Sequence, residues 1–159
     1  MCTGIILQAR CNSKRLPNKI IKNIKNKPII ELVIERLKKI PGVDLIVATT
    51  KRKEDDKICK ICLKNQVPFY RGKVNDVLSR YYETASKYKL KTIIRCNADC
   101  PFIDRNLLKK MLKIFKKRKY DYFSNILEPS FPSGLHIEIF NFKTMKIAFR
   151  KAKSSSDRE

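Results

Sequence analysis

The chain has 159 residues, the size of one ordinary domain, and its hydrophobic content of 43% is normal for a globular protein. Its formal net charge of +22 raises nucleic acid as a partner, but the lysines follow the polar faces of expected helices without an RNA-binding aromatic signature, so a solvated surface is favoured over nucleic acid. Because no apolar run reaches the roughly 18 residues of a transmembrane helix and no signal peptide is recognisable, we expect a cytoplasmic protein with no membrane partner.

The first expected strand covers residues 4–9 and runs into a basic loop. Residues 1–27 contain seven basic side chains and no acidic one. Arg10, Arg15 and Lys19 follow the strand, where open α/β sheets bind their ligands. The loop carries neither GxGxxG nor GxxxxGK[ST], so side chains rather than a glycine-rich backbone would hold phosphates. Arginine can bind two phosphate oxygens at once and lysine supplies a mobile charge, so the loop predicts a polyanion site.

The rest of the chain alternates helices and strands. Helices are expected from Pro28 to the region of Gly42, at 54–65, at 74–88, after Asp104 and from about 143. Strands are expected at 44–50, 67–72, 91–99, 120–124 and 136–142. Strands separated by single helices imply a mostly parallel sheet with helices on both faces, a three-layer α/β/α architecture. No linker or repeat interrupts residues 1–159, so a single domain is expected.

Two carboxylates stand at the boundaries of expected elements. Asp99 ends a buried-type strand and opens towards the same sheet edge as the basic loop, where one carboxylate plus phosphate oxygens suits Mg²⁺. It could also merely start a turn, because a proline follows shortly after it. Asp76 lies near a helix start, where a carboxylate stabilises the N-terminus by itself. Ligand binding and helix capping therefore both stay open for Asp76.

Several motifs then occur in a fixed order along the chain. Residues 8–19 read Q-A-R-x-x-S-x-R-L-P-x-K. The others are Lys27-Pro28, I-E-R-L at 34–37, A-T-T at 48–50, R-G-x-x-x-D-V-L-x-R-Y-Y at 71–82, R-x-N-A-D-C-P at 95–101, Y-D-Y-x-S-N at 120–125 and G-L-x-x-E at 134–138. This series resembles the sugar-acid cytidylyltransferases, which include CMP-Kdo and CMP-acylneuraminate synthetases, and most closely their spore-coat polysaccharide branch. The resemblance covers nearly the whole chain.

The resemblance implies a fold like that of the nucleotide-diphosphosugar transferases and an enzyme using CTP and Mg²⁺. Such an enzyme activates a sugar acid as its CMP derivative and releases pyrophosphate, for surface polysaccharide or glycan biosynthesis. Arg10 and Lys19 fall on catalytic positions and Asp99 on the metal-binding aspartate. The implied nucleotide-binding residues are Gln8, Ala9, Arg10, Ser13, Arg15, Lys19, Arg71, Asp76, Arg80 and Asn97. A homodimer is an open expectation.

Two departures from the family pattern bear on activity. His136 stands where the branch usually has aspartate, and imidazole is a poor ligand for hard Mg²⁺; Glu138 is an open substitute. Residues 154–159 resemble the start of a longer family segment, so we expect an exposed, poorly ordered tail and an incomplete sugar site, with CTP binding retained and CMP transfer slow or absent.

The fold also hosts other activities, so two further hypotheses stay open. One is a related nucleotidyltransferase or glycosyltransferase that uses another nucleotide. The other is a non-catalytic basic domain that binds nucleotide or RNA.

Overall fold

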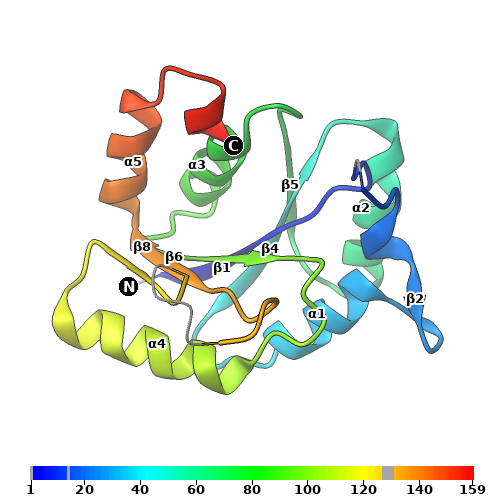
Figure 1. Ribbon diagram of the computed structural model, residues 1–159, viewed down its shortest axis with the longest axis horizontal. Coiled ribbons are helices and arrows are strands. Elements are labelled where there is room, and N and C mark those ends of the chain that lie inside the picture. The colour runs from blue at the N-terminus through cyan, green and yellow to red at the C-terminus, as the bar shows by residue number, and fades with distance from the viewer. Residues whose placement is uncertain (1, 14, 127–130) are drawn as a thin grey trace.

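A six-stranded sheet forms the centre of the computed structural model, which describes residues 2–13, 15–126 and 131–159 (Figure 1). Its strands are β1 (Thr3–Gln8), β4 (Asp44–Thr50), β5 (Phe69–Gly72), β6 (Thr92–Asn97), β7 (Tyr122–Ser124) and β8 (Glu138–Asn141). The spatial order is β5-β4-β1-β6-β8-β7. The first four strands in that order are parallel, while β8 runs antiparallel to both β6 and β7. The predicted mostly parallel sheet is confirmed.

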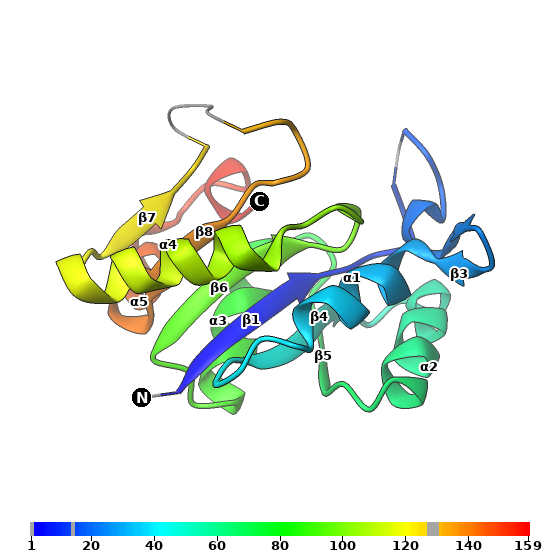
Figure 2. The same ribbon diagram turned by 90° about the horizontal axis from the view of Figure 1, so that it is seen from below.

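Helices cover both faces of this sheet. They are α1 (Ile29–Leu37), α2 (Asp56–Lys64), α3 (Val77–Lys87), α4 (Arg105–Arg118) and α5 (Phe142–Lys151). Viewed from below, α1 and α4 lie across the strands, with α3 and α5 behind (Figure 2). Among the described residues, none of the helices combines the length and apolar character needed to cross a membrane.

Side-chain alternation along β1 explains the three layers. Ile5 and Leu7 are fully buried in a cluster with apolar residues of α1, α2 and α4. Ile6, between them, is buried in a second cluster with residues of α3 and α5. Successive side chains of a strand point to opposite faces, so a continuous apolar run requires cover on both sides. The α/β/α prediction is confirmed in this respect.

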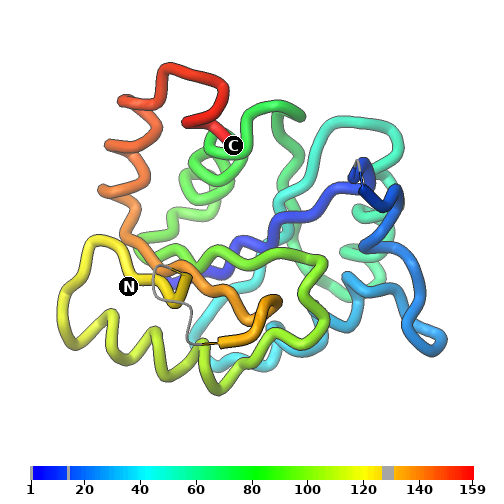
Figure 3. The backbone as a smooth tube through the Cα atoms, viewed as in Figure 1, coloured from blue at the N-terminus to red at the C-terminus, as the bar shows by residue number. Residues whose placement is uncertain are grey.

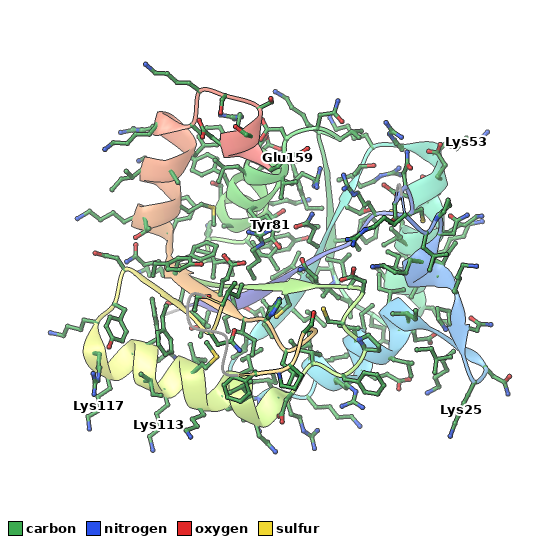
Figure 4. All side chains as sticks on the ribbon, in the orientation of Figure 1. Lys25, Lys53, Tyr81, Lys113, Lys117 and Glu159 are labelled. Atoms are coloured by element: carbon green, nitrogen blue, oxygen red, sulfur yellow. The ribbon has the colours of Figure 1, made fainter. Side chains whose placement is uncertain are left out.

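The lysines of α4 lie on its outer side. Figure 4 shows Lys113 and Lys117 pointing away from the sheet, and both are exposed. The opposite side of this helix contributes Leu108, Met111, Leu112 and Phe115 to the core. This is the amphipathic pattern expected of a helix with one solvated face.

A short hairpin was not expected from the sequence. It pairs β2 (Asn23–Ile24) with β3 (Lys27–Pro28), immediately before α1. Its turn places Lys25 at φ 46°, in the left-handed region that usually calls for glycine or asparagine. Because lysine is not a turn signal at such a position, the pattern gave no indication of this hairpin.

Helix α3 begins later than the apolar pattern suggested, because Asp76 caps it. The Asp76 Oδ1 atom accepts a hydrogen bond from the Ser79 N–H at 2.8 Å, and the helix starts at Val77. The capping interpretation of Asp76 is therefore confirmed.

The expectation of an unanchored tail at residues 154–159 is wrong. A 3-10 turn, η3 (Ser156–Arg158), folds back beside α3 (Figure 3). The Arg158 Nε–H donates to Asp76 Oδ2 at 2.9 Å, and the Arg158 guanidinium lies 4.9 Å from the centre of the Phe149 ring. Most side chains of the segment are exposed, as expected. The pairing partner lies 82 residues away in sequence, so no local pattern could reveal this anchor.

Asp76→Ala should lower the free energy of unfolding by about 1–2 kcal/mol, because it removes the N-cap of α3 as well as the partner of Arg158. Denaturant unfolding of both proteins measures this difference. Asp76→Asn is the matched control, since asparagine caps helices as well as aspartate but carries no charge. It should recover most of the loss. An equal loss in both variants would mean that the ion pair, and not the cap, carries the stability.

Candidate functional site

A cavity of about 270 Å³ opens at the carboxyl ends of β1 and β6. The residues named from the sequence that line it are Gln8, Arg10, Ser13, Arg15, Lys19, Asn97 and Asp99. Gln8 and Asn97 are neighbours because β1 and β6 pair in parallel register at those residues. Arg10, Ser13 and Arg15 come from the loop after β1, and Asp99 follows β6. Parallel neighbouring strands thus bring the basic loop and the carboxylate to one place.

Lys19 and Asp99 are in direct contact within this cavity. The Lys19 Nζ atom donates to Asp99 Oδ2, and the two side chains are 33% and 35% exposed. Ion pairs that are this exposed contribute little to stability, because water solvates both charges well. An incoming polyanion or metal ion can therefore replace this contact at small cost. The proposed catalytic cation and the proposed metal ligand face the same space.

Two residues with amide oxygens share the cavity lining with Asp99. Gln8 Oε1 is buried and has no hydrogen-bond partner among the described residues. Gln8 and Asn97 line the cavity together with the Asp99 carboxylate. In residues 2–13, 15–126 and 131–159 there is no group of three or more His, Cys, Asp or Glu side chains that could hold a metal. The residues present fit Mg²⁺, which commonly takes one or two carboxylates and completes its shell with phosphate oxygens and water.

A second hollow, of about 470 Å³, adjoins the first and shares Asp99 and Lys19 with it. His136 lines this second hollow, so the residue that departs from the family pattern lies near the candidate metal ligand. Cys100 also lines it. Burial, followed by the nearby Asp99 charge, raises the pKa of the Cys100 thiol to about 11. The thiol is therefore protonated at neutral pH when no metal is bound.

Glu138, the open substitute for the missing aspartate, is already engaged. Its Oε1 atom lies 3.4 Å from Arg95 Nη1, and its Oε2 atom accepts a hydrogen bond from the Tyr122 hydroxyl at 2.9 Å. Arg95 itself lines the first cavity and, although it begins the 95–101 motif, was not among the site residues expected from the sequence. Strand alternation could have found it, because Arg95 lies two residues before Asn97 and so shares its face of β6. Ile20 and Ala98 complete the lining and carry no chemical signal.

Arg71, implied to bind nucleotide, does not line this cavity. Its Nε–H donates to the Thr50 carbonyl at 2.9 Å and its Nη2 to the Arg52 carbonyl at 2.8 Å. Its Nη1 lies 2.7 Å from Asp56 Oδ1. Arg71 therefore stabilises the connection between β4 and α2.

The Asp76 carboxylate is likewise already engaged, by the N-terminus of α3 and by Arg158. A nucleotide contact by either residue stays a prediction.

Arg80 is buried and is not part of the cavity lining. It is 1% exposed, and its Nη1 donates to the carbonyls of Lys73 and Val74 at 2.5 and 2.9 Å. Its Nε and Nη2 have no partner among the described residues. Burial, and then the charge of Arg10, lower the pKa of Arg80. Ala9 is also buried, and its N–H donates to the Ala48 carbonyl at 3.0 Å. Ligand contacts of Ala9 and Arg80 remain predictions.

Residues 4–159 match the family model described as cytidylyltransferase. The chain belongs to the cytidylyltransferase family. A cytidylyltransferase structure from Leptospira borgpetersenii superimposes on it with a TM-score of 0.93 at 32% identity, over 100% of this chain and 68% of that one. This agrees with the α/β architecture and confirms the family resemblance found from the motifs.

Curated relatives of this cytidylyltransferase chain include proteins of three organisms. An uncharacterized protein of Methanocaldococcus jannaschii is 38% identical over 157 residues, 97% of this chain and 63% of its own length. The spore coat polysaccharide biosynthesis protein SpsF of Bacillus subtilis is 29% identical, over 86% of this chain and 58% of its own. A 3-deoxy-manno-octulosonate cytidylyltransferase of Hydrogenovibrio crunogenus is 28% identical, over 92% and 60%. The chain thus spans about three fifths of the length of these relatives.

Proposed function

We propose that this cytidylyltransferase chain binds CTP with Mg²⁺ and supports transfer of CMP to a sugar acid, for surface polysaccharide or glycan biosynthesis. An acceptor hydroxyl oxygen attacks the α-phosphorus, the bond from that phosphorus to the β-bridging oxygen breaks, and pyrophosphate leaves with the bond electrons. The hydroxyl proton passes to solvent or a nearby base. The observation that carries the proposal is the cavity in which Arg10, Arg15 and Lys19, which follow β1, meet Asp99, which follows β6.

The chemistry of the lining suits a nucleoside triphosphate. Arg10 and Arg15 would hold phosphate oxygens through their planar forks, and Lys19 would follow the negative charge that develops on departing pyrophosphate. Phosphoryl and nucleotidyl transfer depend mainly on positioning and charge stabilisation, which these side chains supply. Asp99 would hold Mg²⁺, and Gln8 and Asn97 line the same cavity. When bound, the metal would offset phosphate charge.

The acceptor class rests on the relatives. One of them is named a 3-deoxy-manno-octulosonate cytidylyltransferase, and octulosonate is a sugar acid; another is named for spore coat polysaccharide biosynthesis. The second hollow, with His136 in its lining, lies beside the phosphate cavity and could receive such an acceptor. CTP binding and CMP transfer by these 159 residues are tested separately, because the relatives are longer than the part that this chain matches.

CTP with Mg²⁺ should raise the melting temperature of this chain more than UTP, ATP or GTP does at equal concentration. At about 100 times its Kd a ligand stabilises the native state by about 2.7 kcal/mol, which corresponds to a rise of roughly 5–10 °C for a chain of this size. Differential scanning fluorimetry with the four nucleotides measures this. Equal shifts would support a nucleotidyltransferase of another or broad base preference. No shift, together with strongly salt-dependent RNA binding, would overturn the proposal in favour of a basic binding domain.

A further inference from the structure

Both ends of the basic loop after β1 hydrogen-bond to one residue, Cys11. The Cys11 carbonyl accepts hydrogen bonds from the Ser13 N–H at 3.0 Å and from the Asn18 N–H at 2.8 Å. The loop between these two donors carries Arg15, and Lys19 follows directly after it. Since both ends of the loop hydrogen-bond to the same carbonyl, the Cys11 backbone restrains the part of the chain that carries these cations. Cys11 itself is buried, with 1% of its surface exposed.

Cys11 is in turn tied to a buried carboxylate that does not line the cavity. The Cys11 N–H donates to Asp55 Oδ1 at 2.7 Å, and the Thr50 hydroxyl donates to Asp55 Oδ2. Asp55 is 2% exposed. One residue before Arg10, the Ala9 N–H is fixed to the Ala48 carbonyl. Arg10 therefore lies between two backbone anchors, and one of them depends on the Asp55 side chain.

Asp55 uses its side chain for this contact and not for its own helix. It is the last residue of a 3-10 turn, η2 (Lys53–Asp55), that runs directly into α2, so its backbone is already helical. Within the described residues, its side chain makes no capping bond to α2. The carboxylate instead crosses to the β1 loop, 44 residues away in sequence. Both carboxylate oxygens of Asp55 are therefore used for contacts outside α2, one to Cys11 and one to Thr50.

The segment that carries Asp55 is also held by contacts with Arg71. Arg71 on β5 hydrogen-bonds the carbonyls of Thr50 and Arg52 and pairs with Asp56, so both flanks of Asp55 are fixed. The contacts form a continuous series from Arg71, through the 50–56 connection and Asp55, to Cys11. Arg71, which does not line the cavity, thus stabilises the segment that carries Asp55.

We infer that Asp55 is a positioning residue, which sets the phosphate-binding loop through the Cys11 backbone without touching the nucleotide. The inference rests on the proposed function for its consequence, because the value of a fixed loop is that Arg10, Arg15 and Lys19 meet the triphosphate already in place. A preorganised loop binds more tightly than one that must be ordered on binding. Asp55→Ala would leave the Cys11 N–H buried without its acceptor and release that anchor.

The test compares wild type with Asp55→Ala, Asp55→Asn and Glu54→Ala. Glu54 is exposed, and Glu54→Ala removes the same charge from the position next to Asp55. Hydrogen exchange at Cys11, Ser13 and Asn18, measured without ligand, reports the loop itself. Calorimetric titration with CTP and Mg²⁺ reports its consequence. We expect faster exchange at these amides in Asp55→Ala and a CTP Kd raised by about tenfold or more, as loss of an acceptor by a buried donor would give.

Asp55→Asn keeps an oxygen for the Cys11 N–H and should recover most of both effects, while Glu54→Ala should match wild type. Where CMP transfer is measurable, KM for CTP should rise more than kcat falls. If Asp55→Ala does not fold, Asp55→Ser takes its place. The serine side chain is polar but shorter than that of aspartate, so its hydroxyl lies farther from the Cys11 N–H. Unchanged loop exchange, or a rise spread evenly over all amides, would overturn the inference. A wild-type chain that does not bind CTP, but whose loop exchange still depends on Asp55, would instead overturn the proposed function alone.

Discussion

Replacing Lys19 by alanine should weaken CTP binding and slow turnover together, by about 2–4 kcal/mol, the usual range for removing a donor that stabilises developing charge. Lys19 lies at the exit of the basic loop with its ammonium group in the cavity, in contact with Asp99. A phosphate group entering the cavity would draw that ammonium group away from Asp99. Calorimetric titration with CTP and Mg²⁺ gives the change in affinity, and pyrophosphate release with a panel of octulosonic and nonulosonic acids gives the change in rate.

Lys22→Ala is the matched control for Lys19→Ala. Lys22 is exposed and is absent from the described linings of both hollows, yet its replacement changes the net charge equally. It should leave CTP affinity near the wild-type value. Thermal unfolding of the Lys19 variant should change little, because the lost ion pair is one-third exposed. Wild-type affinity and kinetics in Lys19→Ala would remove this residue from the site.

The meeting of the basic loop with Asp99 could be expected from the sequence for a physical reason. Both segments follow apolar strands, and the carboxyl ends of parallel strands share one edge of a sheet. The sequence does not state which strands are neighbours. The observed order puts β6 directly beside β1, so Gln8 and Asn97 become neighbours and Lys19 reaches Asp99. Strand period and residue type were enough to predict the six strands of the sheet and its helices, but not the β2–β3 hairpin, and the order of the strands came only from the folded chain.

The contacts of Arg71 and Asp76 show what residue type alone could not predict. A motif fixes which side chain is present but not where its polar atoms point. Arg71 faces Thr49 in the β4–β5 register, which puts its guanidinium next to the carbonyls of the following connection. Asp76 is used by its own helix and by Arg158. Such partners are distant in sequence, so local patterns carry no trace of them. The same holds for Asp55, whose sequence context suggests only a helix start.

Asp99→Asn should leave the fold intact and weaken the dependence of CTP binding on Mg²⁺. An amide oxygen can still face the metal but carries no charge, and Mg²⁺ strongly favours charged oxygen ligands. Loss of a partner in the outer shell of a metal site already costs roughly tenfold in affinity, so the loss at a direct ligand should be at least of that order. The measurement is a Mg²⁺ titration of CTP binding in both proteins, read as the midpoint concentration.

Asp104→Asn provides the control for Asp99→Asn, since it removes the same charge in the next turn of the chain. Asp104 caps α4 by accepting from the Asn106 and Leu107 N–H groups, and asparagine caps equally well, so the fold and the Mg²⁺ midpoint should both stay as in wild type. The variant at Asp99 also frees Lys19, which should strengthen phosphate binding in the absence of metal. Affinity for CTP without Mg²⁺ should therefore hold or rise while the gain on adding Mg²⁺ shrinks. If the midpoints in wild type and Asp99→Asn coincide, Asp99 is not the metal ligand.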